Sequence, residues 1–508
     1  MRPGSSVGPS FPSSAASLAD RLSTDNHATA NHTAANHTAA KPKSATGAIP
    51  EASPDEYVWP LGVVAGVPPE PVGKSTRSAG EPRDPCEVAP ASAGDHPAIQ
   101  QLLSAVFHAP SREEFSASLE DPLYEPCDRI VLKRGPQLLG HVHLAQRAMR
   151  FQGESLPVSA LHRLAVLPEF RNRGYGLRLL SQVDAAMKAE GSVLGLLTTR
   201  APHFFRRKDW VVCMRHSHAM VGARDLLAQL SARGFAPHGA DDAINIRPWR
   251  HVELPSLVRL YAEETAAAFG PYERTEAYWR WLVGRQAAEN IFVALAGPKR
   301  FDFDFHDDSI VGYVIQRDDR IVELVASAQH PGTAERLLAR ACGESIERDH
   351  HVVRLHLAPS DPLWRIVEGA EGELHRSEAS QGEVTMVKLL DPEGFLHRLL
   401  PTLHDRAAAA QQAGRLRRPL ELGIVVGEHR LRLSISQRSA KVSRGAPGRS
   451  WIQLSKADFT RMLLGHLDLA EAADAGRVKS STRPTLEAAA ALFPRLPLWH
   501  PPLDDMLV

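Results

Sequence analysis

Residues 161–176 read Leu-His-Arg-Leu-Ala-Val-Leu-Pro-Glu-Phe-Arg-Asn-Arg-Gly-Tyr-Gly, and this stretch decides the fold around it. Its first part is apolar enough to predict a buried strand, which Pro168 ends. A basic turn with Gly174 and Gly176 follows, and from Leu177 onward apolar residues recur at helical spacing. We therefore expect a strand, a basic loop and a helix N-terminus in direct succession.

This succession suits an anionic ligand such as a phosphate. Free backbone N–H groups and the positive end of the helix dipole meet at a helix start. Gly174 and Gly176 permit a close backbone approach, and Arg171 and Arg173 add fork-shaped donors. By itself, a basic turn with two glycines is as typical of an ordinary helix entry as of a ligand site.

The longer string Val166-x-Pro168-x-x-Arg171-x-x-Gly174-x-Gly176 resembles the acetyl-CoA signature of the GNAT superfamily of N-acetyltransferases. A second motif, Phe-Phe-Arg-Arg-Lys-Asp-Trp-Val-Val at 204–212, resembles that family's late helix and last strand, usually F-Y-x-x-x-G-F. The resemblance implies acetyl-CoA as co-substrate and no metal, with the CoA pyrophosphate on the loop amides and the pantetheine arm beside the strand. The implied cofactor-binding residues are Leu164, Ala165, Val166, Arg171, Asn172, Arg173, Gly174, Tyr175 and Gly176.

Length and composition limit what the rest of the chain can be. The chain has 508 residues, which favours about three domains. Lys+Arg and Asp+Glu number 59 each, so global charge favours neither nucleic acid nor an anionic membrane. Residues 1–85 are rich in Ser, Ala, Pro, Gly and Thr and repeat Asn-His-Thr-Ala-Ala, which predicts a disordered low-complexity tail.

The four cysteines are widely spaced and form no C-x-x-C pair. This usage predicts free thiols in a reducing compartment, and hence a cytoplasmic protein without a disulfide framework or structural zinc. No apolar run approaches the roughly 20 residues of a spanning helix, so we expect no membrane span.

Two segments have the pattern of a GNAT-like fold. Residues 86–220 predict an early helix, a run of strands and a βαβ unit, and we interpret them as the acetyl-CoA-binding domain. Residues 240–390 begin with another strand, and helical patterns follow at 253–269 and 277–282. At 329–337, where a second acetyl-CoA loop would stand, the paired glycines and basic residues are missing. This predicts a degenerate second fold without a cofactor site.

Residues 391–508 predict a third, α+β domain. Strands are expected at 420–426 and 429–436, and helices at 456–464 and 486–493. Two GNAT-like units before such a unit resemble the enhanced-intracellular-survival type of acetyltransferase, whose third domain is similar to sterol carrier proteins. The implied fold class is α/β (α+β): tandem GNAT-like mixed-sheet domains, a sterol-carrier-protein-like domain and a disordered N-terminal tail. The resemblance also implies a homo-oligomer.

Clusters of possible metal ligands have simpler interpretations. The acidic stretch at 302–308 lies between two predicted strands and favours an exposed hairpin loop over a metal site. His350, His351 and His356 favour a surface helix end and a strand.

Acetyl transfer from a thioester to an amine needs a base for the amine and donors for the oxyanion, and an acid helps the thiolate to leave. By simple alternation, His162 lies on the same side of its strand as Leu164 and Val166. Its intrinsic pKa of about 6.5 suits a base, and Leu161-His162-x-Leu164-Ala165-Val166 resembles the arylalkylamine branch, where a histidine draws off the amine proton. The alternative is a histidine that only fills a polar niche.

The acid departs from the family pattern. The usual tyrosine corresponds to Phe205, which has no proton to donate. In the enhanced-intracellular-survival group, that tyrosine works with the C-terminal carboxylate, here on Val508. Tyr175 or water could substitute, the thiolate could leave unassisted, or the domain could bind acetyl-CoA without turning it over. Two functions stay open: an N-acetyltransferase acting on a small-molecule or peptide amine, and a non-catalytic acetyl-CoA- or apolar-ligand-binding protein.

Overall fold

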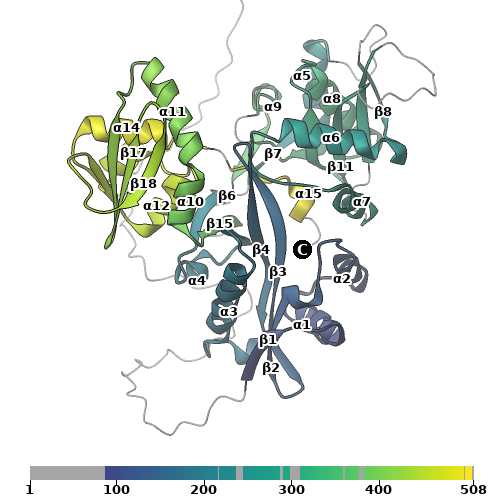
Figure 1. Ribbon diagram of the computed structural model, residues 1–508. Coiled ribbons are helices and arrows are strands. Elements are labelled where there is room, and N and C mark those ends of the chain that lie inside the picture. Colours follow the sequence, from purple (N-terminus) through teal and green to yellow (C-terminus); the bar gives the residue numbers. More distant parts are fainter. Residues whose placement is uncertain are drawn as a thin grey trace, which may run out of the picture. The chain divides into compact units, whose positions relative to one another are not determined.

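The computed structural model describes residues 86–215, 217–235, 244–285, 290–297, 309–358, 361–376, 383–496 and 498–505. These residues form three β-sheets that pack against helices (Figure 1). The mixed α/β class expected from the sequence is confirmed. The tail expected at 1–85 and the acidic loop expected at 302–308 lie outside the described residues.

The first sheet contains residues 161–166, the strand that precedes the basic loop. Its strand order is β1-β2-β3-β4-β5-β15-β6, and β9 pairs with β3 beside this path. The strands are β1 (Cys86–Pro90), β2 (Arg129–Arg134), β3 (Gln137–Phe151), β4 (Glu154–Val166), β5 (Leu194–Thr199), β6 (Val211–Arg215), β9 (Phe269–Tyr272) and β15 (Val384–Leu389). Its helices are α1 (His96–Phe107), α2 (Arg112–Leu119), α3 (Tyr175–Ala189) and α4 (Pro202–Arg206).

The predicted succession of strand, loop and helix is confirmed. β4 ends at Val166, a short 3-10 turn covers Pro168–Phe170, and α3 begins at Tyr175. The apolar face of α3 is buried against β2, β3 and β4 through Leu179, Leu180, Val183 and Met187. Full burial of such a side chain contributes about 1.5–3 kcal/mol, so the helix start that carries the basic loop is held firmly on the sheet.

The second sheet has the order β14-β7-β13-β12-β11-β10-β8. Its strands are β7 (Ser217–Gly222), β8 (Ile244–Pro248), β10 (Asn290–Ala296), β11 (Ile310–Arg317), β12 (Arg320–Ala326), β13 (Val352–Leu355) and β14 (Glu373–Arg376). Its helices are α5 (Ala223–Ala232), α6 (Leu254–Glu264), α7 (Glu276–Gly284), α8 (Thr333–Glu347) and α9 (Trp364–Gly369). Helix α8 packs against α5 and against β11 and β12.

Three strands pair across the segments predicted from the sequence. β7 joins β13 and β14 in the second sheet, and β15 lies between β5 and β6 in the first. The helical pattern expected over 253–269 is wrong in its last part, because α6 ends at Glu264 and β9 pairs with β3. Gly270, with φ of 120°, has a conformation outside the helical region. The domain boundaries near 220, 240 and 390 therefore remain predictions.

The third sheet has the order β18-β17-β16-β19-β20. Its strands are β16 (Leu420–Val426), β17 (His429–Ile435), β18 (Ala440–Arg444), β19 (Trp451–Leu454) and β20 (Val478–Ser480). The helices that follow β15 are α10 (Pro392–Arg398), α11 (Leu400–Gln412), α12 (Lys456–Leu463), α13 (Leu469–Asp474), α14 (Arg483–Leu492) and α15 (Pro502–Asp505). After α14 the chain runs back to β9, where the Trp499 amide donates to the Phe269 carbonyl at 3.0 Å.

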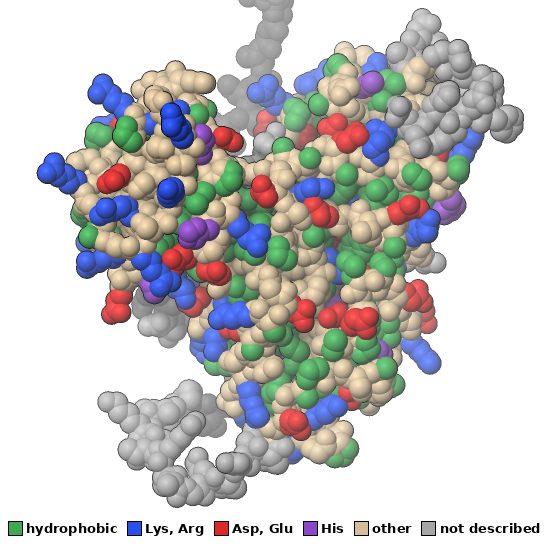
Figure 2. Space-filling view, in the orientation of Figure 1, with side chains coloured by type: hydrophobic (Ala, Val, Ile, Leu, Met, Phe, Trp, Pro, Cys, Tyr) green, Lys and Arg blue, Asp and Glu red, His purple; other side chains and the backbone are tan. Residues whose placement is uncertain are grey.

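Charged side chains are mixed over the described surface. On the face shown in Figure 2, acidic and basic groups alternate over much of the view, and Lys and Arg are frequent at its left. Among the described residues, no helix is both long and apolar enough to cross a membrane.

Candidate functional site

The basic loop between β4 and α3 is open to solvent. Arg171, Asn172, Arg173 and Gly174 are all exposed. Gly174 caps α3 with φ of 82° and ψ of −3°, and a Cβ built there would meet no atom within 4 Å. Arg171 and Arg173 each donate one hydrogen bond to a backbone carbonyl of the turn, of Val166 at 3.2 Å and of Glu169 at 3.1 Å. The loop thus combines shape, free space and positive charge at a helix N-terminus.

The end of β4 separates from its neighbour β5. Their parallel pairing runs from Val158 opposite Leu194 to Leu161 opposite Leu197 and goes no further. Beyond Leu161, β4 pairs only with β3 among the described strands. Because an unpaired strand edge presents N–H and C=O groups, residues 163–166 offer hydrogen bonds to an extended ligand beside the basic loop.

A β-bulge changes the face on which His162 lies. His141 pairs with Ala165 and His143 pairs with His162, so Arg163 and Leu164 together stand opposite Val142. Arg163 has φ of 50°, a left-handed conformation uncommon outside glycine.

The alternation expected for His162 is therefore wrong. Leu164 and Val166 pack with Leu161 against the core under α3, whereas Ala165 packs with the core under α1. His162, paired with His143, shares the face of Ala165. The two histidine rings are 5.7 Å apart between centroids.

A pocket of about 580 Å³, including its open mouth, lies on this second face of the sheet. His162, Arg163 and His143 form its β-sheet wall, and Phe115 of α2 stands beside them. The remaining walls come from distant parts of the sequence. They include Tyr272, Tyr278, Trp281 and Asp504. Its lining combines aromatic side chains with polar and charged groups, as small-molecule sites do.

Two of the carboxylates in this pocket already have cationic partners. Asp121 forms an ion pair with Arg147, and both side chains are more than nine-tenths buried. Asp504 forms an ion pair with Arg274 at 2.7 Å. A third carboxylate, on the exposed Glu114, accepts from the Ser111 amide at 2.8 Å and caps α2.

The arginines on the sheet wall are placed differently. Arg129 is only 2% exposed. It donates hydrogen bonds to the hydroxyl groups of Tyr124 and Ser118 and to the ring of His141, and none of these groups is an anion. Burial lowers the pKa of His141 to about 3, so its ring is neutral and links the guanidinium of Arg129 to the carbonyl of Arg163. Burial also lowers the pKa of Arg129 itself.

The position of the usual acid is occupied by a core side chain. Phe205 is 6% exposed and packs edge-on against Phe204 and Trp210. Asp209, which stands where the motif usually has glycine, has φ of 65°, a conformation that Asp tolerates better than most residues. Tyr175, a candidate substitute acid, lies beside Cys86, whose thiol approaches its hydroxyl to 3.4 Å. Tyr175 does not line the pocket.

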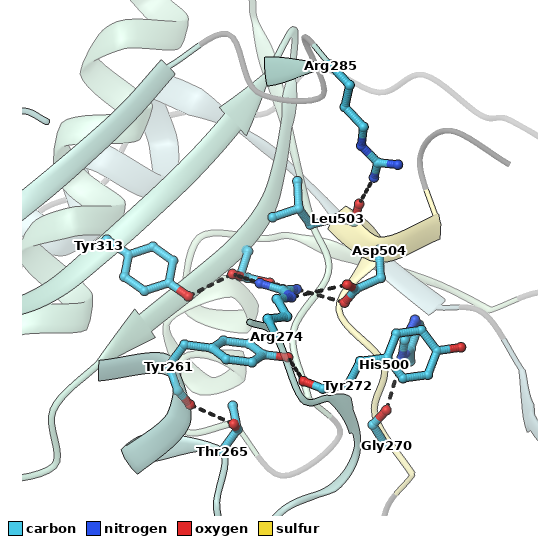
Figure 3. A network of polar contacts seen from close by, with 11 residues as sticks. Tyr261, Thr265, Gly270, Tyr272, Arg274, Arg285, Tyr313, His500, Leu503 and Asp504 are labelled. Carbon is cyan, nitrogen blue, oxygen red and sulfur yellow. Dashed lines mark hydrogen bonds and ion pairs between the residues drawn. The ribbon is translucent and has the colours of Figure 1, made fainter. Parts of the chain in front are cut away.

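The C-terminal segment is anchored at the pocket. Figure 3 shows the Arg274 guanidinium facing the Asp504 carboxylate, and Arg274 also donates two hydrogen bonds to Glu323 at 2.9 and 2.6 Å. All three side chains are fully buried. Arg285 donates to the Leu503 carbonyl at 2.6 Å, and burial lowers its pKa to about 10. Val508, whose carboxylate the resemblance implied for catalysis, lies outside the described residues.

In the described residues, no group of three or more His, Cys, Asp or Glu side chains is arranged to hold a metal ion. Sequence patterns could not have found Tyr272, Tyr278, Trp281 or Asp504, because no local motif distinguishes these residues and only tertiary packing brings them to the sheet.

Comparisons with known proteins identify two domains in the chain. A family model described as an acetyltransferase (GNAT) domain matches residues 87–213, and a sterol carrier protein domain matches residues 424–501. No curated protein matches the chain.

Three solved structures are similar over most of their length. A GCN5-related N-acetyltransferase from Kribbella flavida has a TM-score of 0.60 at 16% identity, covering 82% of this chain and 99% of that one. One from Anabaena variabilis has 0.60 at 14%, covering 82% and 99%. Eis1 from Mycobacterium abscessus has 0.55 at 18%, covering 81% and 98%. Identities this low show a shared fold alone.

Proposed function

Since the chain carries a GNAT acetyltransferase domain followed by a sterol carrier protein domain, we propose that it is an N-acetyltransferase that transfers the acetyl group of acetyl-CoA to an amine. The observation that carries this proposal is the continuity of three features along one segment. The loop at 171–176, the unpaired strand edge at 163–166 and the pocket beside His162 lie along one segment, with only the turn at 167–170 between the loop and the strand edge.

The loop and the strand edge fit acetyl-CoA. The open space over Gly174, the start of α3 and the two arginines would hold the pyrophosphate. The backbone of Leu164, Ala165 and Val166 would bond the pantetheine arm, which directs the thioester toward the bulge at Arg163. When bound, acetyl-CoA supplies an activated acyl group with a thiolate leaving group.

His162 is the base in this proposal. Its ring lines the pocket in which an amine would wait, next to the bulge that ends the regular pairing of β4. His162 lies on the same face of β4 as Ala165, not on the expected face of Leu164 and Val166. The pocket lies on the face of His162, which supports the role of His162 as the base. His143 is a poorer base, because burial lowers its pKa well below the usual value for histidine.

No acid is needed at Phe205 if the thiolate leaves with the help of water. Tyr272 and Tyr278 are the hydroxyl-bearing aromatic residues that line the pocket, and burial raises the pKa of Tyr278 above its usual value. A neutral phenol is a donor at physiological pH. Either residue is better placed than Tyr175.

The test combines binding and turnover. Calorimetry with acetyl-CoA should give one site per chain, and release of free thiol should follow on addition of an acceptor from a broad amine panel. If CoA binds with one-site stoichiometry but no amine supports thiol release, the protein is a non-catalytic acetyl-CoA-binding protein and the proposed activity is wrong.

A further inference from the structure

Among the described residues, the two arginines on the sheet wall of the pocket, Arg129 and Arg163, form no ion pair with a carboxylate, although the charge of Asp128 acts on Arg129 from a distance. The charge of Glu114 raises the pKa of Arg163, but less than the charge of Arg129 lowers it. Arg129 donates only to a hydroxyl of Tyr124, a hydroxyl of Ser118 and the neutral ring of His141. The other pocket arginine, Arg147, has its own acid in Asp121.

The two positive charges act on each other. Burial lowers the pKa of Arg163, and the charge of Arg129 lowers it further. His141 holds them on one wall, since it contacts both the Arg129 side chain and the Arg163 backbone at 3.2 Å. A buried cation without a counter-ion is costly unless a ligand supplies the charge, so this wall is suited to an anion.

Donors are also available for such an anion. A guanidinium has five N–H groups, and three of those on Arg129 are used, one each on Nε, Nη1 and Nη2. One N–H therefore remains on each terminal nitrogen, and these two N–H groups are available to the oxygens of a carboxylate.

We propose that the amine acceptor also carries a carboxylate, which binds to Arg129 and Arg163, so that the substrate class is an amino acid or a related amino carboxylate. The aromatic side chains of Phe115, Tyr272 and Trp281 in the same pocket accommodate an apolar body. This inference rests on the proposed acetyltransferase function and narrows its acceptor.

The experiment compares matched acceptors. Phenylalanine, leucine and 6-aminohexanoate are each assayed by thiol release against their own carboxamides, with rates expressed per neutral amine. In the wild-type protein, kcat/KM should be about ten- to a hundredfold higher for at least one free acid than for its amide, as expected for charged hydrogen bonds. In Arg163→Asn this ratio should fall toward one, mainly through KM. Asparagine is chosen because it tolerates the positive φ at this position.

Two controls make the result specific. Arg163→Lys keeps the charge and should retain most of the preference. Arg112→Gln removes an exposed arginine that does not line the pocket, and should leave the acid-to-amide ratio as in the wild type. Equal rates for acids and amides in the wild type, or a ratio unaltered in Arg163→Asn, would overturn the inference.

Failure of the proposed function is detected separately. If no amine supports turnover, the CoA-saturated protein is titrated calorimetrically with phenylalanine and phenylalaninamide. Tighter binding of the acid that is lost in Arg163→Asn supports the carboxylate site although the protein is not a transferase. Equal affinities for the two compounds, or no binding of either, would contradict the proposed carboxylate site as well.

Discussion

Gly174 and Gly332 have the same backbone conformation at the starts of two equivalent helices. Gly174 caps α3 with φ of 82° and ψ of −3°, and Gly332 caps α8 with φ of 83° and ψ of −3°. The sequences around them differ, because the second loop has no arginine in the residues just before its glycine and carries Pro331. Arg336 of α8 donates to the Gly332 carbonyl at 3.4 Å. One fold thus holds a loop with two arginines before its glycine and a second loop without them.

This pair provides a control for acetyl-CoA binding. Gly174→Ala adds a Cβ to the open space over the loop, and calorimetry should show a loss of acetyl-CoA affinity of about tenfold or more. Gly332→Ala imposes a comparable backbone strain of about 1–2 kcal/mol, and its Cβ would also lie 2.8 Å from Arg336 Nη1 and 2.9 Å from Phe235 Cε1. Its acetyl-CoA affinity should be unchanged, and a thermal melt must first show that this variant is folded. Equal losses in both variants, or two equivalent CoA sites per chain, would show that the first loop is not the cofactor site.

His162→Ala should lower kcat by about a hundredfold, as expected for the loss of a positioned base. The wild-type rate should fall at acidic pH, because a protonated imidazole ring cannot accept the amine proton. Stopped assays across pH with a saturating acceptor measure both effects. His203→Ala, at an exposed position of α4, is the matched control. A fully active His162→Ala enzyme with the wild-type pH profile would remove His162 from the mechanism.

Phe205→Tyr restores the hydroxyl at the usual acid position. Turnover should rise by about a hundredfold if the hydroxyl reaches the thiolate. Because Phe205 is buried among aromatic rings, a hydroxyl that finds no partner should cost about 1–3 kcal/mol of folding free energy. Phe204→Tyr places a hydroxyl one residue away and should give no gain. Steady-state kinetics measure the change in turnover, and thermal melts measure the change in stability. Robust, equal activity in wild type and Phe205→Tyr would show that another group protonates the leaving thiolate.

Removing residues 503–508 should abolish most turnover and retain acetyl-CoA binding. The deletion removes Asp504 from the pocket and leaves Arg274 with Glu323 as its carboxylate partner. Loss of one partner of a buried ion pair costs about 3–5 kcal/mol, so the melting temperature should fall as well. Asp504→Asn tests the charge alone and keeps the segment. Normal turnover in the deletion variant would show that the segment is structural only.

Acid should destabilise the protein through His141. The folded-state pKa of His141 is about 3, against 6.5 for an unperturbed histidine. Between these two pH values, His141 is protonated in the unfolded chain and neutral in the folded chain. The free energy of unfolding should therefore fall as the pH drops from 6.5 toward 3, by about 1.4 kcal/mol per pH unit for this group. Urea denaturation of wild type and His141→Asn measures the slope. Near pH 5, the slope of the unfolding free energy against pH should be smaller in the variant by the equivalent of about one proton. Identical slopes in the two proteins would show that His141 is not held neutral in the folded state.

Local sequence patterns predicted the parts of the site that are local in the chain. β4, the basic loop and α3 follow one another in sequence, so apolar periodicity, Pro168 and the glycines were sufficient. The face of His162 was not predictable in the same way. Alternation holds only for a regular ladder, and the bulge at Arg163 depends on the register with β3.

Tertiary packing determined the rest. Trp281 and Asp504 lie 119 and 342 residues after His162 in sequence, and they meet it only because α7 and the C-terminal segment pack at the same pocket. The placement of β15 in the first sheet also escaped prediction, since strand pairing at such separation leaves no periodic signal in a single sequence.

The position of β15 has a consequence for synthesis of the protein. Its residues, Val384–Leu389, form the ladder that joins β5 to β6, and they leave the ribosome after the whole second sheet. A nascent chain that already contains β5 and β6 therefore holds two unjoined sheet edges for the time needed to translate about 170 further codons. At about 5–20 residues per second, this interval is on the order of 10–30 seconds, during which those edges need protection from other chains.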